Sequence, residues 1–150
     1  MGKEFLIFKV TEAKEEYARA IERLLPQLSS SHHTFTTDQL QGLIANDCTH
    51  LFLLQTEGTV AGMLTLCGAL SPTGLKMWVE DVVVDASQRG HSFGRALVEH
   101  AIEYVRGNFP EATIMLTSRP ARVAANALYL SAGFAPKETN VYSMKLSEHK

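Results

Sequence analysis

The stretch Glu80–Arg95 constrains the fold most, because it places an apolar strand, a glycine-containing loop and the start of a helix in direct succession. Val82, Val83 and Val84 are β-branched and typical of a buried strand. From Gly94 onward, apolar residues recur at helical spacing. The start of a helix presents backbone N–H groups that have no intrahelical acceptor, and the helix dipole adds partial positive charge there. The stretch therefore predicts an anion-binding loop suited to phosphate.

The residues of this loop exclude two common kinds of phosphate site. Arg89 and Arg95 add positive charge, and Gly90 and Gly94 allow the backbone to approach an anion closely. A P-loop requires GxxxxGK[ST], and here both the glycine spacing and the lysine are missing. A dinucleotide-binding loop requires GxGxxG followed by an acidic residue, which is also absent. A third alternative is the pyrophosphate loop of an acyl-CoA transferase.

Periodicity and turn residues predict a mixed α/β sheet for the chain as a whole. Thr36 and Gln39 have the spacing of a capping box, and Thr56-Glu57-Gly58 separates two apolar runs as a hairpin turn does. The expected strands are 5–10, 50–55, 59–68, 76–84, 113–117, 134–136 and 141–146. The expected helices are 11–28, 36–45, 94–109 and one that begins near Pro120 and ends at Gly133. We therefore expect about six to seven strands flanked by about four helices.

Length and composition indicate one soluble domain. The chain has 150 residues, of which 45% are hydrophobic, so we expect a single domain over residues 1–150. Its 14 basic and 16 acidic residues give a net charge of −2, which does not favour a nucleic-acid partner. No apolar run approaches the roughly 18 residues that span a bilayer, so we expect no membrane association. Residues 1–10 lack a signal-peptide apolar stretch, and a cytoplasmic location follows as the expectation.

Histidine and cysteine spacing gives no metal motif. His32, His33 and His50 lack Cys, Asp or Glu partners at metal-ligand spacing, and Cys48 and Cys67 do not form a CxxC pair. We therefore expect no metal ion in the protein.

Three segments together resemble the GNAT superfamily of N-acetyltransferases. The signature [RQ]-x-x-G-x-[GA] is approached by Arg89-Gly90-His91-Ser92-Phe93-Gly94, in which Ser92 replaces the central glycine. Glu80-Asp81-Val82-Val83-Val84 resembles the family's preceding strand. Ala125-Asn126-Ala127-Leu128-Tyr129, followed by Gly133-Phe134, resembles its later helix. The resemblance implies a GNAT-like, mostly antiparallel mixed sheet and acetyl-CoA as co-substrate.

The resemblance also implies roles for individual residues. Glu80 takes the position of the general base, which acts directly or through a water molecule, and Tyr129 that of the proton donor to the leaving thiolate. The residues implied in cofactor binding are Val82, Val83, Val84, Arg89, Gly90, His91, Ser92, Phe93, Gly94, Arg95 and Asn126. Other readings stay open: Glu80 as a solvent-facing strand-end charge, Tyr129 as core packing and Asn126 as a surface helix residue.

Strand alternation predicts how the two carboxylates are directed. If the strand is regular, Glu80 shares a face with Trp78, Val82 and Val84, whereas Asp81 lies on the other face. The resemblance makes Glu80 the expected base, and Asp81 is expected to be structural or to support it.

The predicted activity is transfer of an acetyl group from acetyl-CoA to a primary amine of a small molecule or peptide, by direct attack. A non-catalytic acyl-CoA-binding or regulatory module on the same fold is the alternative. Residues 139–146 alternate in polarity at the end of the expected sheet, which predicts an exposed edge. The resemblance to the GNAT superfamily implies a homodimer that pairs at this edge.

Overall fold

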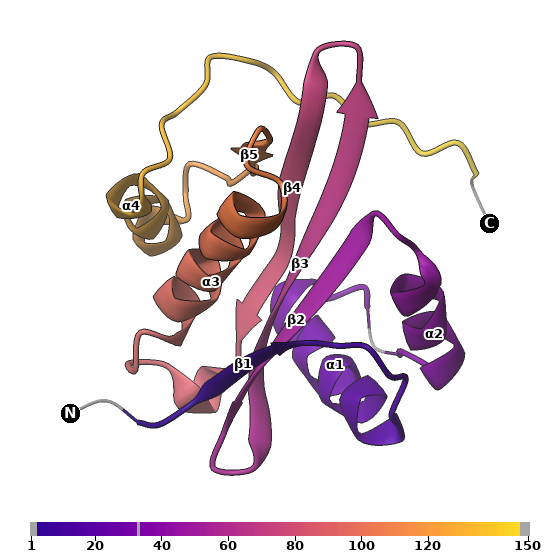
Figure 1. Cartoon of the computed structure of the whole chain (residues 1–150). Coiled ribbons are helices and arrows are strands. Elements are labelled where there is room, and N and C mark those ends of the chain that lie inside the picture. The colour runs from indigo at the N-terminus through magenta and orange to yellow at the C-terminus, as the bar shows by residue number, and fades with distance from the viewer. Residues whose placement is uncertain (1–2, 33, 148–150) are drawn as a thin grey trace.

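The computed structural model describes residues 3–32 and 34–147 and shows a mixed sheet between two pairs of helices (Figure 1). The strands are β1 (Leu6–Lys9), β2 (Thr49–Thr56), β3 (Thr59–Ser71), β4 (Gly74–Val84) and β5 (Thr113–Met115), and they lie in that order across the sheet. The helices are α1 (Glu15–Leu28), α2 (Thr37–Ala45), α3 (Phe93–Asn108) and α4 (Val123–Ala132), with a 3₁₀ turn, η1 (Ala86–Gln88), before α3. The strands are antiparallel except for the parallel pair β4–β5. The mixed, mostly antiparallel sheet and the four α-helices are thus confirmed.

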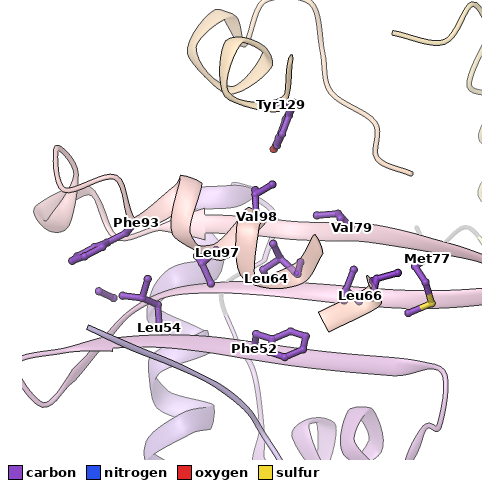
Figure 2. Close-up of a cluster of buried hydrophobic side chains, with 13 residues drawn as sticks. Phe52, Leu54, Leu64, Leu66, Met77, Val79, Phe93, Leu97, Val98 and Tyr129 are labelled. Atoms are coloured by element: carbon purple, nitrogen blue, oxygen red, sulfur yellow. The ribbon is translucent and has the colours of Figure 1, made fainter. Parts of the chain in front are cut away.

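Each face of the sheet carries its own hydrophobic core. On one face α1 and α2 cover Leu51, Leu53 and Met63, together with Val83 of β4. On the other face α3 and α4 cover the second core, which Figure 2 shows with Phe52, Leu54, Leu64, Leu66, Met77 and Val79 of the sheet beneath Leu97 and Val98 of α3. Because both faces are covered, β2 and β3 are apolar almost throughout, as strands buried on two sides are.

Local signals account for most of the element boundaries. The capping box at α2 is present, since Thr36 Oγ1 accepts from Gln39 N–H at 3.0 Å and Gln39 Oε1 accepts from Thr36 N–H at 2.8 Å. Glu57 and Gly58 both have positive φ, at 52° and 75°, which matches the twist of a two-residue hairpin. Gly133 ends α4 in the left-handed region, with φ of 114°.

The two prolines near helix ends take different places. Pro26 lies inside α1, which ends at Leu28 as expected. Since Pro26 lies in the last turn, it costs the helix only one backbone hydrogen bond. Pro120 was expected in the first turn of the later helix, but α4 begins at Val123. Pro120 instead lies within a turn in which Arg122 N–H donates to Arg119 C=O at 3.0 Å.

The expected strands 134–136 and 141–146 do not form, so the sheet has five strands among the described residues, and the expectation of six to seven was wrong. Within the described chain, no backbone hydrogen bond joins residues 135–147 to another segment. A strand requires a partner for its backbone groups as well as a suitable residue pattern. Figure 1 shows this segment as an extended yellow trace that leaves the α4 side and passes the end of the β3–β4 hairpin.

The regular alternation expected for β4 is interrupted at Asp81. Glu80 pairs with Thr65 and Val83 pairs with Met63, so Asp81 and Val82 together face the single residue Leu64. This two-against-one pairing is a β-bulge, and Asp81 takes the left-handed conformation, with φ of 52°. As a result Val82 and Val84 pack on the α3 side and Val83 on the α1 side. The prediction that Val82 and Val84 share a face with Glu80 was therefore wrong.

No helix within residues 3–32 and 34–147 has both the length and the apolar composition that crossing a membrane requires.

Candidate active site

A cleft opens where β4 and β5 part. β5 pairs with β4 only from Lys76 to Trp78, so the edge of β4 beyond Trp78 has no neighbouring strand from β5. The cleft has a volume of about 170 Å³. Its lining comes from α1, β4, the segment after β5 and α4, and consists of Leu28, Val79, Glu80, Asp81, Val82, Leu116, Thr117, Arg122 and Tyr129. The structure thus brings Glu80 and Tyr129, 49 positions apart in the sequence, to one cavity.

Glu80 and the bulge residue Asp81 both line this cleft. The separation expected from strand alternation therefore does not keep Asp81 out of the cleft. Partial burial raises the pKa of Glu80, and the negative charge of Asp81 raises it further. A raised pKa makes a carboxylate a stronger base near neutral pH, so Glu80 has the properties of a proton acceptor.

Tyr129 reaches the cleft from the opposite side. It lies on α4, is only 8% exposed and packs edge-on against Phe134 at 6.1 Å between ring centroids. Figure 2 shows its hydroxyl directed from α4 toward α3 and the sheet. Tyr129 is therefore both a core residue and a cleft residue, since its ring packs with the α3-side cluster while the side chain lines the cavity. A phenol in this place can donate a proton.

The loop after β4 has the backbone conformation of an anion cradle. Gly90 has φ of 90°, Ser92 has φ of 61°, and α3 begins at Phe93. The first α3 N–H with a carbonyl acceptor is that of Ala96, which donates to Ser92 C=O at 3.0 Å. Among the described residues, no backbone acceptor receives the N–H groups from Gly90 to Arg95. A Cβ atom at Gly90 would meet nothing within 4 Å, so the backbone there is open to a ligand. These features fit a pyrophosphate group.

Several residues implied in cofactor binding have other contacts. Phe93 is 2% exposed and belongs to the α3-side core, where it packs edge-on against Phe5. Arg95 bonds Ser131 of α4 and pairs with Glu99 at 3.1 Å. Asn126 donates to Arg119 C=O at 3.0 Å and fastens the start of α4. Val83 faces the α1-side core.

Arg89, Gly90, His91, Ser92 and Gly94 remain in or beside the loop. Arg89, Gly90 and Ser92 are exposed, His91 is half-buried with its ring 5.5 Å from that of Phe93, and Gly94 lies in the first turn of α3. A Cβ atom at Gly94 would be 3.7 Å from Leu128 and 3.9 Å from Val84, so α3, α4 and β4 converge at this point.

Three lining residues had no signal of their own in the sequence. Leu28 ends α1, and Leu116 and Thr117 follow β5. Each reaches the cleft because of where its element packs, so only the assembled fold identifies it.

Two of the histidines considered as metal ligands, His50 and His32, make contacts with neighbouring side chains. His50 is buried, with Nδ1 3.2 Å from the Tyr104 hydroxyl, and burial lowers its pKa, as does nearby Lys9. His32 Nδ1 lies 3.0 Å from Ser29 Oγ, and His33 lies outside the described residues. In the described part of the chain, no three His, Cys, Asp or Glu side chains are grouped as metal ligands.

A second hollow of about 170 Å³ lies at the end of α2, beside Lys9, Leu43, Asp47 and His50. It shares no lining residue with the cleft beside β4. The carboxylates, Tyr129 and the strand that leads into the anion cradle all belong to the β4 cleft, so the chemistry is assigned there.

Known structures resemble the whole fold. A candidate acetyltransferase from Agrobacterium tumefaciens strain C58 aligns with a TM-score of 0.80 and 22% identity, over 93% of this chain and 99% of that one. Glucosamine-6-phosphate N-acetyltransferase from Arabidopsis thaliana aligns with a TM-score of 0.75 and 20% identity, over 95% of this chain and 99% of that one. The aminoglycoside N-acetyltransferase AAC(6')-Iy in complex with CoA aligns with a TM-score of 0.76 and 13% identity, over 98% of both chains.

Comparison with curated protein sequences finds no match. The model of the acetyltransferase (GNAT) family matches residues 13–134, which include the cleft and the anion cradle. With more than half of its length matched, and with the family's fold around the cleft, the chain belongs to the acetyltransferase (GNAT) family.

Proposed function

We propose that this protein is an N-acetyltransferase, a single GNAT domain over residues 1–150 that moves an acetyl group from acetyl-CoA to a primary amine. One observation carries the proposal: Glu80 and Tyr129 line one cleft, at the strand that leads into the anion cradle. A base on one side and a proton donor on the other are what amine acylation by a thioester requires.

The anion cradle would hold the pyrophosphate of acetyl-CoA. Backbone N–H groups from Gly90 to Arg95 would donate to its oxygens, and Arg89 would add positive charge. His91 would contribute its backbone N–H. Arg95 and Asn126 would contribute indirectly, because both fasten α4 beside the cradle. When bound, acetyl-CoA supplies the activated acetyl group as a thioester.

The free edge of β4 would position the acetyl group. The bulge at Asp81 disrupts the β3–β4 ladder, and β5 does not pair with β4 beyond Trp78. Backbone N–H groups of the Val82–Val84 segment that point away from β3 would therefore be available to the acetyl carbonyl oxygen, where negative charge develops during attack.

Proton transfers are assigned to the two side chains in the cleft. Glu80 would accept a proton from the acceptor amine, directly or through a water molecule, and the free amine would then attack the thioester carbonyl. Tyr129 would donate its hydroxyl proton to the departing thiolate, and the second proton that the nitrogen loses as it becomes an amide would restore the Tyr129 hydroxyl. Holding the two substrates in one cleft would supply much of the acceleration.

The acceptor is proposed as a small molecule or peptide with a primary amine. The structural relatives include enzymes named for glucosamine-6-phosphate and for aminoglycosides, all of which carry amines. The two carboxylates of the bulge would attract a protonated amine to the cleft before Glu80 removes its proton.

Binding and turnover test the proposal separately. Saturating acetyl-CoA should raise the melting temperature, because a ligand that binds the folded state stabilises it by mass action, and adenine nucleotides should raise it much less. A free-thiol release assay against amino sugars, polyamines and peptides should then identify an acceptor. Absence of a shift with acetyl-CoA would refute the proposal, and binding without thiol release across the panel would favour a non-catalytic binding module.

We further propose a homodimer that uses residues 139–146. Val141, Tyr142, Met144 and Leu146 are each at least 72% exposed, which is unusual for large apolar side chains in one short segment. A second copy of the chain would cover them.

A further inference from the structure

Helix α1, which covers the opposite face of the sheet from α3, makes direct contacts with the turn that leads into the anion cradle. That turn begins at Asp85, directly after β4, and continues through η1 to Arg89. Two α1 side chains reach it, Arg23 and Gln27, although they lie about 60 positions earlier in the chain. Both are exposed residues, so burial of apolar surface does not explain their placement.

The contacts form one connected polar network. Gln27 Oε1 accepts from Ala86 N–H at 2.8 Å. Arg23 Nε lies 3.6 Å from Asp85 Oδ2, and an Nη of the same guanidinium donates to Val60 C=O at 2.6 Å. Asp85 Oδ1 in turn accepts from the Ser87 N–H at 3.1 Å and from the Ser87 hydroxyl at 3.0 Å.

The electrostatics of the network favour an ionised Asp85. The Ser87 backbone N–H is the largest cause of a lowered pKa at Asp85, and the Ser87 hydroxyl, Arg23 and Gln27 also lower it. The side chain of Asp85 is 19% exposed, which makes its bonds less subject to solvent competition than those of the surface ion pairs elsewhere on α1. The turn is thus fixed both by contacts with α1 and by the hydrogen bonds that Asp85 makes within the turn.

The last turn of α1 is also a wall of the cleft. Leu28, the residue after Gln27, lines the cavity with Glu80 and Tyr129. Pro26 has no N–H, so this last turn lacks one of its helical hydrogen bonds, and the Gln27 contact with Ala86 provides an anchor outside the helix.

We infer that Arg23 and Gln27 are positioning residues that hold the acyl-CoA loop in its binding conformation and couple it to the Leu28 wall of the cleft. This rests on the proposed function. The network fixes the direction in which the chain leaves β4, and hence where the N–H groups from Gly90 to Arg95 point. Without this network the loop samples other conformations. Part of the free energy of CoA binding is then used to order the loop, and the observed affinity is lower.

The test compares α1 variants in CoA binding by calorimetry. Gln27→Ala and Arg23→Ala should each weaken CoA binding about three- to thirtyfold, the range typical of coupled neighbouring contacts. Arg23→Lys, which keeps the charge, should recover part of the loss. Arg19→Ala is the matched control, because Arg19 lies one helical turn earlier, is similarly exposed and contacts Glu15, Glu22 and Phe35 instead of the loop.

Steady-state kinetics separate positioning from a merely structural effect. For Gln27→Ala, the KM for acetyl-CoA should rise while kcat at saturating acetyl-CoA stays within about twofold of the parent, since the bound complex restores the loop. A lower melting temperature with an unchanged CoA affinity would mean that the network only stabilises the fold, and would refute the inference.

Amide hydrogen exchange tests the coupling itself. CoA should slow exchange at the end of α1, in residues 25–29, in the parent protein and much less in Gln27→Ala. If the parent binds CoA with no change in residues 25–29, and Gln27→Ala binds as tightly as the parent, the inference fails while the proposed function stands. If the parent does not bind CoA, the proposed function fails, and the inference falls with it.

Discussion

Asp81 and Ser92 are two of three non-glycine residues with positive φ in the described chain, and they stand on either side of the turn that leaves β4. A left-handed conformation costs a residue with a Cβ atom about 1–2 kcal/mol relative to an ordinary backbone conformation. Asp81 lies in the bulge and lines the cleft, and Ser92 precedes the first turn of the helix that completes the anion cradle. Backbone strain of this kind is typical of binding and catalytic sites.

Ser92→Gly tests what the hydroxyl contributes. Glycine adopts φ of 61° without steric cost, so the variant should bind CoA at least as tightly as the parent in calorimetry, with an equal or higher melting temperature. Gly90→Ala is the opposite control. It puts a Cβ atom on a residue with φ of 90°, so it should lower both the CoA affinity and the melting temperature. Weaker CoA binding by Ser92→Gly would show that the Ser92 hydroxyl is itself a ligand of the phosphate.

Glu80→Gln tests the base. The amide keeps the size and hydrogen-bonding capacity of the side chain but cannot accept the proton, so turnover at neutral pH should fall by about a hundred- to ten-thousandfold while CoA affinity stays nearly unchanged. The loss should shrink at high pH, where more of the acceptor amine is already deprotonated. Tyr129→Phe should lose less turnover than Glu80→Gln. The measurement is a pH–rate profile with one amine.

Asp81→Asn in the same profile distinguishes the two carboxylates. The Asp81 charge contributes to the raised pKa of Glu80, so its removal should lower that pKa. The base works only when ionised, and the acidic limb of the profile should therefore move to lower pH, with most of the plateau rate retained. An inactive Asp81→Asn beside an active Glu80→Gln would transfer the role of base to Asp81.

Among the elements, the C-terminal segment shows the limit of pattern-based prediction. Tyr142, Met144 and Leu146 alternate with Ser143 and Lys145 as a half-buried strand would. The alternation predicts which side chains share a face, but a strand forms only if another chain segment pairs with it. By contrast, the capping box at Thr36 and the hairpin turn at Glu57-Gly58 depend on a few neighbouring residues, and both were predicted correctly.

The proposed dimer gives this segment a testable role. A triple variant, Tyr142→Ser, Met144→Ser and Leu146→Ser, should be monomeric in light scattering at concentrations where the parent is dimeric, because it removes the apolar face. Lys145→Ser, on the other face of the segment, should leave the dimer intact. A parent protein that stays monomeric across the concentration series would contradict the dimer.

At the scale of the whole molecule, the anion cradle was predictable and the full cleft was not. The cradle lies within one stretch of sequence, where glycines, Arg89 and helical spacing can be seen together. Leu28 and Arg122 enter the cleft from elements 94 positions apart. The direction of Asp81 depends on a bulge that two-residue periodicity conceals. Such features follow from tertiary packing, which local propensity does not encode.

The bulge also changes the usual effect of a deletion. When one residue is removed from a regular strand, every later side chain of that strand turns to the opposite face of the sheet. Side chains that belonged to one core would then face the other core. In β4, Asp81 is the extra residue of the bulge, so its removal would restore regular alternation from Trp78 to Val84. Val82, Val83 and Val84 would stay in the cores that they occupy now. That deletion should leave cooperative thermal unfolding intact and abolish acetyl transfer. The same deletion at Phe52, in a regular part of β2, should prevent folding. Asp81 is thus the one position of β4 whose removal leaves the facing of the later side chains unchanged, and it lines the proposed active site.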